Sequence, residues 1–220
     1  MRYITYIIFF LGLSVSAQIP NRFVYVKEVI PDLMVELRYY TDNNFVGSKI
    51  DGYHSNKLIL TERAAKALKL VQEELLDQNL CLLVYDGYRP QQAVNHFMRW
   101  AVKLNDTINK HYFYPNVLKK DLFTEGYIAT KSGHSRGSTI DLTIIDANTN
   151  EPIDMGGTYD FFGEKSWTNY QNISEQQKLN RQLLKTIMLK YGFVNFQKEW
   201  WHYSLKDEPF PDTYFDFDIE

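Results

Sequence analysis

The sequence predicts a single α+β domain built on a mostly antiparallel sheet with flanking helices. Three segments repeat apolar residues at helical spacing, and five others are rich in β-branched and aromatic residues. These helices and strands do not alternate regularly along the chain. A doubly wound parallel fold requires such alternation, so the pattern favours the α+β class.

The expected helices carry separate start signals. Thr61 can cap the first, Pro90 suits the first turn of the second, and Ser174 with Gln177 has the spacing of a capping box for the third. Each segment has an apolar stripe that can pack against a sheet. The helices are expected at residues 61–78, 90–104 and 174–191.

The strands follow from runs of apolar residues bounded by turn signals. In the fourth run, Ile140, Leu142 and Ile144 alternate with Asp141 and Thr143. Because successive side chains of a strand point to opposite faces, Asp141 is expected on the face opposite the apolar one. The strands are expected at residues 24–29, 34–39, 80–85, 139–145 and 193–205.

Composition narrows the class of protein. The 220 residues include 24 Lys+Arg and 27 Asp+Glu, so the formal net charge is −3 and no clustered basic excess indicates a nucleic-acid partner. A hydrophobic fraction of 45% is enough for a core and excludes bulk disorder. The single cysteine, Cys81, excludes an intramolecular disulfide and a thiolate-cluster metal site, whereas five histidines leave a histidine-based site open.

Residues 1–17 have the pattern of a secretory signal peptide, which leaves residues 18–220 as the expected mature domain. Arg2 precedes an apolar run at 4–13, and small residues at 14–17 suit cleavage near Ala17. The run is about half of the roughly 20 residues that span a bilayer. The protein is therefore expected to be exported, periplasmic or extracellular, with no stable membrane insertion after cleavage.

Three short stretches concentrate reactive side chains. DGYRP at 86–90 places Arg89 between a strand and a helix, and SGHSRGSTID at 132–141 places His134 in a loop of small residues before Asp141. EWWH at 199–202 contains Glu199 and His202. Residues three apart on a strand face opposite sides, so both can serve one site only if Glu199 lies in a turn or bulge before the strand.

Two imidazoles and a carboxylate, from His134, Asp141 and His202, form the ligand set of a catalytic zinc site, which keeps a further position for water. Zinc lowers the pKa of such a water to near 7. Glu199 is then a candidate general base, and Arg89 is a candidate to stabilise an oxyanion. The pattern predicts a zinc hydrolase.

A competing motif is present at residues 133–137, which match the G-x-S-x-G elbow of serine hydrolases with Ser135 as nucleophile. The elbow needs an apolar strand before it and a helix after it. Here polar residues precede the motif and a β-branched strand follows it, so the context disfavours a serine esterase.

The same stretches resemble the zinc-dependent D-alanyl-D-alanine dipeptidases known from vancomycin resistance. The wider group, which includes D-Ala-D-Ala carboxypeptidases, shares S-x-H-x(6)-D and a later histidine. The likeness spans nearly the whole mature chain, including DGYRP at 86–90, FMRW at 97–100, HSRGS at 134–138, DFFGEKS at 160–166 and EWWHY at 199–203.

The resemblance implies a role for each of seven residues. It implies one zinc ion per chain held by His134, Asp141 and His202, with Glu199 as the catalytic carboxylate and Arg89 as the transition-state arginine. It further implies that Asp160 pairs with the substrate ammonium and that Ser132 lies near the other end of the substrate. On sequence pattern alone, Asp160 reads as an ordinary turn aspartate.

The expected activity is hydrolysis of the dipeptide D-alanyl-D-alanine to two D-alanines in cell-wall peptide turnover. Two alternatives stay open: a carboxypeptidase acting on peptidoglycan stems, and a zinc-stabilised binding module without turnover. Asp160 favours the dipeptidase, because a carboxylate that pairs with the substrate ammonium requires a substrate with a free N-terminus. Glu199 argues against a binding module, because a module without turnover needs no base. The resistance enzymes are cytoplasmic, so their physiological role is not implied here, and the oligomeric state is left open.

Overall fold

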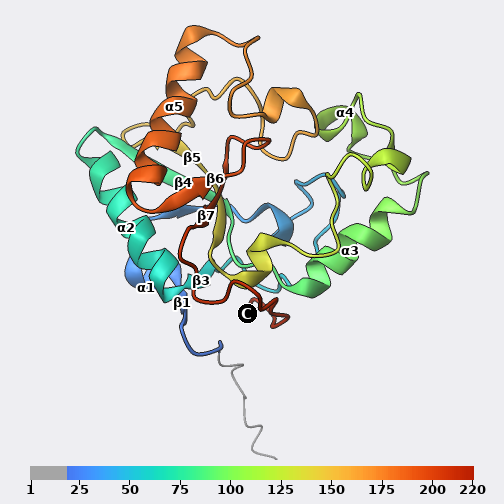
Figure 1. Cartoon of the computed structure of the whole chain (residues 1–220), viewed down its shortest axis with the longest axis horizontal. Helices are drawn as coiled ribbons and strands as arrows, with labels where there is room; N and C mark the ends of the chain where they lie inside the picture. Colours follow the sequence, from blue (N-terminus) through green and yellow to red (C-terminus); the bar gives the residue numbers. More distant parts are fainter. Residues whose placement is uncertain (1–18) are drawn as a thin grey trace, which may run out of the picture.

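The computed structural model describes residues 19–220, and the expected signal peptide at 1–17 lies outside them. Across the described residues the chain forms a five-stranded sheet and a two-stranded sheet surrounded by helices (Figure 1). The expected α+β class with a mostly antiparallel sheet is confirmed, because three of the four strand pairings in the large sheet are antiparallel. Its strands, in spatial order, are β2 (Met34–Val35), β4 (Leu80–Asp86), β5 (Thr139–Asp146), β7 (His202–Leu205) and β6 (Phe193–Asn195), with β2 parallel to β4.

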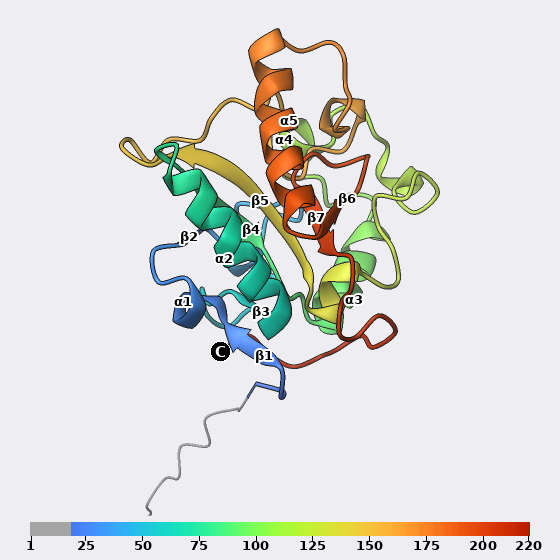
Figure 2. The same cartoon turned by 60° about the vertical axis from the view of Figure 1, so that its left-hand side comes forward.

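Two long helices, α2 (Glu62–Leu76) and α5 (Glu175–Lys190), run side by side along one face of the large sheet (Figure 2). Both predicted start signals are present. The Thr61 hydroxyl accepts a hydrogen bond from the Ala64 amide, and Ser174 and Gln177 form a complete capping box. Among residues 19–220, no helix has the length and apolarity to cross a membrane.

The sequence pattern misplaces part of the apolar face of α5. Leu179 belongs to the apolar repeat that predicts this helix, together with residues 183, 187 and 188, yet it is exposed, whereas Arg181 is buried. The Arg181 guanidinium donates to the carbonyl oxygens of Met155, Trp167 and Lys165 at 2.6, 2.7 and 2.9 Å. These hydrogen bonds satisfy the buried cation, and they tie α5 to the segment that carries Asp160. Burial lowers the pKa of Arg181 to about 10.

On the other side of the sheet lie α3 (Gln91–Ala101) and α4 (Lys110–Phe113) (Figure 1). The strand β5 is therefore buried on both faces. Asp141 points away from the apolar face of Ile140 and Leu142, as predicted, but it is only 2% exposed. The polar face of β5 is the floor of an enclosed site and not a solvated surface.

The N-terminal part of the chain differs from the prediction. The strand expected at 24–29 ends at Tyr25: β1 (Phe23–Tyr25) gives way to the one-turn helix α1 (Val26–Val29). One helical turn brings Val26 and Ile30 onto the same side, and both are buried. The strand expected at 34–39 likewise ends at Val35 and continues into a 3₁₀ turn, Arg38–Tyr40, which directs Tyr39 into the core.

The region expected as one strand at 193–205 is a hairpin. β6 and β7 pair antiparallel, with Phe193 opposite Leu205, and residues 196–201 form the connection. Glu199 lies in this connecting turn, three residues before His202. This is the arrangement that allows both side chains to reach one site.

The two ends of the described chain meet. β1 pairs antiparallel with β3 (Ile59–Thr61), a strand that the sequence pattern did not predict. The Phe23 ring of β1 contacts the rings of Phe210, Phe215 and Phe217 in the C-terminal tail, with centroids 4.9–5.8 Å apart. The tail therefore packs as part of the core.

Candidate active site

Three elements bring together the predicted metal ligands. His134 lies in the 3₁₀ turn Gly133–Arg136, Asp141 lies on β5, and His202 is the first residue of β7. Asp141 and His202 are direct partners across the two strands. The turn ends at Gly137 with φ +82°, where a Cβ would lie 2.1 Å from the Phe23 ring, so only glycine fits between the histidine loop and β1.

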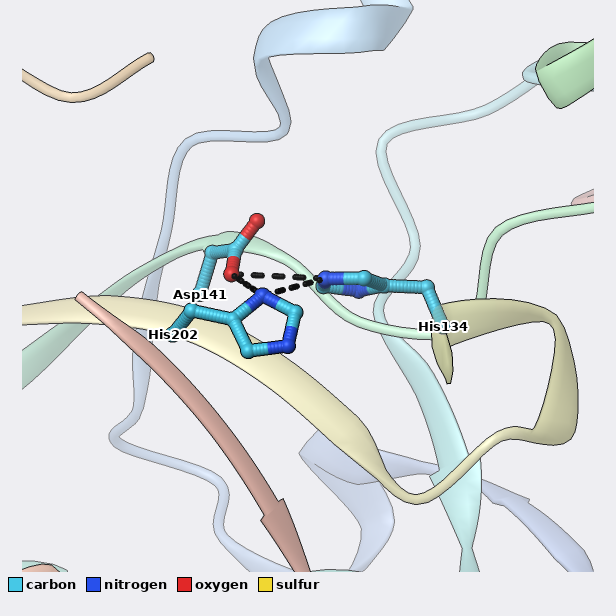
Figure 3. Close-up of side chains that lie close together, drawn as sticks. All are labelled: His134, Asp141 and His202. Carbon is cyan, nitrogen blue, oxygen red and sulfur yellow. Dashed lines mark hydrogen bonds and ion pairs between the residues drawn. The ribbon is translucent and has the colours of Figure 1, made fainter. Parts of the chain in front are cut away.

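The three side chains converge on one point, as Figure 3 shows. His134 Nε2 and His202 Nδ1 are 3.3 Å apart, and they lie 3.3 and 3.0 Å from Asp141 Oδ1. A tetrahedral ion with bonds of 2.0–2.1 Å separates its ligand atoms by about 3.3–3.4 Å. The triangle of side-chain atoms therefore has the dimensions of a tetrahedral zinc site.

The hydrogen bonds around this triangle also fit a cation. His134 Nδ1 lies 2.8 Å from the carbonyl oxygen of Gly87, and a proton on Nδ1 leaves a lone pair on Nε2 facing the site. Asp141 Oδ2 accepts from the Tyr159 hydroxyl at 3.1 Å, whereas buried Oδ1 has no hydrogen-bond partner. A buried carboxylate oxygen without a donor, beside a nitrogen lone pair, is the arrangement that a metal ion satisfies.

Mutual interactions in the triad set its protonation. Burial raises the pKa of Asp141, but the neighbouring imidazoles of His134 and His202 outweigh burial and hold it below its usual range. Burial lowers the pKa of His134. Burial also acts to lower the pKa of His202, but Asp141 and Glu199 outweigh burial and raise it.

Glu199 borders the metal ligands. Its Oε2 lies 3.3 Å from His202 Nδ1, and its side chain is 34% exposed toward the cavity. The cavity walls remove water from the carboxylate and raise its pKa, and the charge of Asp141 adds to this rise. A carboxylate with a raised pKa is suited to accept and return a proton near neutral pH.

Arg89 is held from below by a carboxylate that the sequence prediction did not include. Asp86, at the end of β4, is fully buried, and its Oδ2 accepts from Arg89 Nε and Nη2 at 2.9 and 2.8 Å. Its Oδ1 accepts from the Tyr53 hydroxyl at 2.7 Å. The guanidinium also lies over the Tyr39 ring, 4.9 Å from its centroid. Paired in this way, Arg89 keeps a fixed charge and a fixed direction.

Asp160 occupies a left-handed backbone conformation with φ +58°, which aspartate tolerates better than most residues. The Tyr39 hydroxyl donates to its Oδ2 at 2.7 Å, and within the described structure no other group donates to this carboxylate. Burial raises the pKa of Asp160 well above its usual range, and the charge of Asp141 adds to the shift. A bound cation would restore the ionised form.

All seven predicted site residues line one cavity of about 280 Å³. Ser132 lies at its edge, where its Oγ accepts from the His134 amide at 3.3 Å. Aromatic side chains, including Phe162 and Phe196, form much of the wall. The volume is just below the usual range for sites of drug-sized ligands, about 300–1,000 Å³, and suits a small molecule.

A larger cavity of about 800 Å³ contains none of the seven residues. It meets the site at Tyr159, which lines it and donates to Asp141. Its walls bring together Arg38, Asp42 and Asp154 without a comparable cluster of potential metal ligands. The smaller cavity is therefore the candidate active site.

The sequence prediction missed the residues that support the site. Asp86 lies within the DGYRP stretch, so its position beside Arg89 was the available signal. Tyr39 and Tyr159 carried no such signal, because nothing in the sequence distinguishes them from the other 14 of the 16 tyrosines. Their roles depend on tertiary contacts with Asp160 and Asp141.

The serine-hydrolase elbow is not formed. Ser135 lies in the 3₁₀ turn before β5, so a strand and not a helix follows it. Its side chain is fully buried, and Oγ has no hydrogen-bond partner to act as a base. A nucleophilic serine needs both access and a base, so this motif match carries no chemistry.

Comparisons with known proteins agree with the site. The family model described as D-ala-D-ala dipeptidase, peptidase family M15, matches residues 20–220. A D-alanyl-D-alanine dipeptidase of Enterococcus faecalis is 42% identical over 199 residues, covering 90% of this chain and 98% of that protein. The enzymes of the same name from Enterococcus faecium and Streptomyces coelicolor are 40% and 41% identical, each with 90% and 98% covered.

A solved structure of a mutant of the vancomycin resistance D,D-pentapeptidase VanY, in complex with Zn(II), is 16% identical with a TM-score of 0.41. It covers 70% of this chain and 76% of that chain, a likeness too weak to support an argument about the site. The sequence relatives and the family model are decisive, and they confirm the resemblance stated above. The chain belongs to the D-ala-D-ala dipeptidase family of peptidases.

Proposed function

We propose that this protein hydrolyses free D-alanyl-D-alanine to two D-alanines, with one zinc ion per chain. The observation that carries the proposal is the shared cavity. A cluster of potential metal ligands, a proton-accepting carboxylate, a fixed guanidinium and a second carboxylate line one volume of about 280 Å³. The names of the sequence relatives support the choice of substrate.

His134, Asp141 and His202 would hold the metal, since their donor atoms already lie at tetrahedral spacing. When bound, zinc would supply a Lewis acid for the peptide carbonyl and would lower the pKa of a nearby water. Tyr159 and the Gly87 carbonyl would hold two of the ligands in orientation, through Asp141 Oδ2 and His134 Nδ1.

Glu199 would move the proton. The attacking water forms a bond from its oxygen to the peptide carbonyl carbon and gives a proton to the Glu199 carboxylate. The same carboxyl then passes that proton to the leaving nitrogen as the C–N bond breaks. A raised pKa suits both steps, because the group must accept a proton and release it at similar pH.

Arg89 would stabilise the negative charge that develops on the carbonyl oxygen. Asp86 holds two of its nitrogens, so the guanidinium needs no reorientation when the charge appears. Preorganised donors of this kind commonly contribute about 10²–10³-fold to kcat. The neighbouring Tyr39 ring limits the remaining freedom of the side chain.

Asp160 and Ser132 would define the two ends of the substrate. Asp160 has one neutral donor, Tyr39, and lacks a cation, so the free ammonium of a dipeptide would complete its environment. The Ser132 hydroxyl hydrogen is available to the carboxylate at the other end, since its oxygen already accepts from His134. A site built around an ammonium rejects acylated substrates.

The test compares release of D-alanine from D-Ala-D-Ala and from its N-acetyl derivative, with and without a chelator. We expect cleavage of the free dipeptide only, abolished by chelation and restored by zinc. Equal hydrolysis of the acetylated compound would replace the proposal with a carboxypeptidase, and no hydrolysis of either, with zinc bound, would favour a binding module.

A variant at Asp160 sharpens this test. Loss of a charge-assisted hydrogen bond contributes about 1.5–3 kcal/mol, so Asp160→Ala should raise KM by about 10–150-fold. Zinc content should stay unchanged, because Asp160 is outside the metal triad. An unchanged KM would show that the ammonium binds elsewhere.

We also propose that the protein acts in cell-wall peptide turnover after export and removal of residues 1–17. The composition of that segment supports export, and the family match begins after it, at residue 20. Cell fractionation with N-terminal sequencing of the mature protein tests this. A cytoplasmic protein that keeps residue 1 would overturn it.

A further inference from the structure

The C-terminal tail returns to the active-site loops. In Figure 2 it leaves β7 and runs along the lower edge of the molecule to the region of β1. We define residues 215–219 as the C-terminal strap. Its backbone and side chains contact the segment that carries Arg89 at several points, although more than 120 residues separate the two in sequence.

Phe215 joins two catalytic loops through its own peptide groups. Its amide donates to the carbonyl oxygen of Ser135 at 2.8 Å, in the histidine turn. Its carbonyl oxygen accepts from the Gln91 amide at 3.0 Å. Gln91 directly follows residues 86–90, the arginine segment. One residue of the strap therefore sets the spacing between the loop of His134 and the loop of Arg89.

The strap also holds the residue before Arg89. The Tyr88 ring stacks on the Phe217 ring, with centroids 4.0 Å apart and planes 9° apart. The Tyr88 hydroxyl donates to the Phe217 carbonyl oxygen at 3.0 Å and accepts from the Phe217 amide at 2.8 Å. Tyr88 is fixed in rotation by these contacts, and Arg89 is the next residue.

The strap caps the helix that follows Arg89. Pro90, the N-cap position of α3, has no side chain able to accept from the first free amides. Asp216 Oδ1 accepts from the Gln92 amide at 2.7 Å, and Asp218 Oδ1 accepts from the Gln92 side chain at 2.7 Å. Carboxylates at a helix N-terminus are favourable, so the strap anchors α3 where it leaves the arginine segment.

The last contacts of the strap hold the tyrosine that donates to Asp86, the carboxylate beneath Arg89. The Ile219 amide donates to the Gly52 carbonyl oxygen, and the Ile219 carbonyl oxygen accepts from the His54 amide, both at 2.9 Å. Tyr53, held between these two bonds, donates to Asp86, and Asp86 holds the guanidinium. The strap thus contacts segments on both sides of Arg89 and the backbone around Tyr53, which reaches the guanidinium through Asp86.

From this convergence we infer that the C-terminal strap positions Arg89 for the reaction. None of residues 215–219 lines the cavity; they are positioning residues that act through Arg89. The inference rests on the proposed function, in which Arg89 stabilises the developing charge. Misplacement of a catalytic group by about 1 Å can cost 10²-fold in rate, so loosening the strap should reduce kcat.

A double-mutant cycle tests this inference. Tyr88→Phe removes only the hydroxyl that binds Phe217, and Asp216→Ala removes the exposed cap of α3. In the parent we expect each to lower kcat for D-Ala-D-Ala by about 10–100-fold with nearly unchanged KM. In an Arg89→Ala background, the same changes should alter kcat by less than about twofold.

Asp212→Ala is the matched control. It is also an exposed tail aspartate, but it makes no hydrogen bond or ion pair within the described structure, so kcat should not change. Equal losses in both backgrounds would overturn the inference, since the strap would then act on the fold as a whole. If Tyr88→Phe does not fold, the Asp216→Ala cycle decides the matter alone.

An NMR readout is independent of turnover. The Arg89 Nε–H bond to Asp86 should give a slowly exchanging signal, assigned by its loss in Arg89→Ala. The signal should broaden or exchange faster in both strap variants and stay unchanged in Asp212→Ala; an unchanged signal in the strap variants would refute the inference. If the parent does not cleave D-Ala-D-Ala, the proposed function fails, and this measurement still tests the strap.

Discussion

Tyr159→Phe removes a single hydroxyl behind the candidate metal centre. The ring should stay in place, because it stacks on Tyr85 at 4.7 Å and packs edge-to-face on Trp201 at 5.5 Å. The hydroxyl donates to Asp141 Oδ2. The Arg89 Nη2 atom lies 3.6 Å from the same oxygen, which is too far for a hydrogen bond that could replace it. Asp141 therefore loses its fixed orientation.

The size of the effect follows from the contact. A hydrogen bond to a charged group contributes about 1.5–3 kcal/mol. At 3.1 Å this bond is longer than the usual 2.7–2.8 Å for O–H···O, so the lower part of that range applies, about 1.5–2 kcal/mol. Zinc affinity should fall by about 10–30-fold, since each 1.4 kcal/mol is tenfold.

Competition against a chromogenic chelator measures this affinity. Tyr85→Phe is the matched control, because its ring contacts Tyr159 while its hydroxyl makes no hydrogen bond to Asp141 among the described residues. The control should bind zinc like the parent. If Tyr159→Phe also binds zinc as tightly as the parent, the hydroxyl does not orient Asp141 and the reasoning is wrong.

Three further predictions use other parts of the structure. Glu199→Gln should lower kcat by about 10²–10⁴-fold with zinc content retained, and near-normal turnover would identify another base. Arg181→Met should destabilise the protein by about 3 kcal/mol or more, because three buried or partly buried hydrogen bonds from the guanidinium to carbonyl oxygens are lost; a shift below 1 kcal/mol in urea unfolding would contradict this. Ser135→Ala should keep hydrolase activity, whereas inactivation with normal zinc content would revive the serine mechanism.

Local sequence signals predicted the regular elements well where they were long. The N-cap at Thr61, the capping box at Ser174 and the alternation around Asp141 each specify an element through neighbouring residues. Short elements were missed because tertiary contacts select them. The turn of α1 exists because Val26 and Ile30 both reach the core, and neither residue signals a helix by itself.

For the candidate site, the sequence predicted the residues that line the cavity but not the residues that support them. Residue chemistry selected five of the residues that line the cavity, and the motif resemblance added Asp160 and Ser132. The supporting residues could not be selected in this way. Tyr39, Tyr53 and Tyr159 act through one hydroxyl each, and only the folded chain shows which acid each hydroxyl meets.

The meeting of the two chain ends has a consequence for the order of biosynthesis. Synthesis proceeds from the N-terminus, so Phe23 is made early, while its partners Phe215 and Phe217 are made after all seven predicted site residues. The histidine turn and the arginine segment likewise receive their link from Phe215 at the end. Contacts of such long sequence separation form late. A growing chain therefore holds every predicted catalytic side chain before the residue that links the loops of His134 and Arg89 has been made.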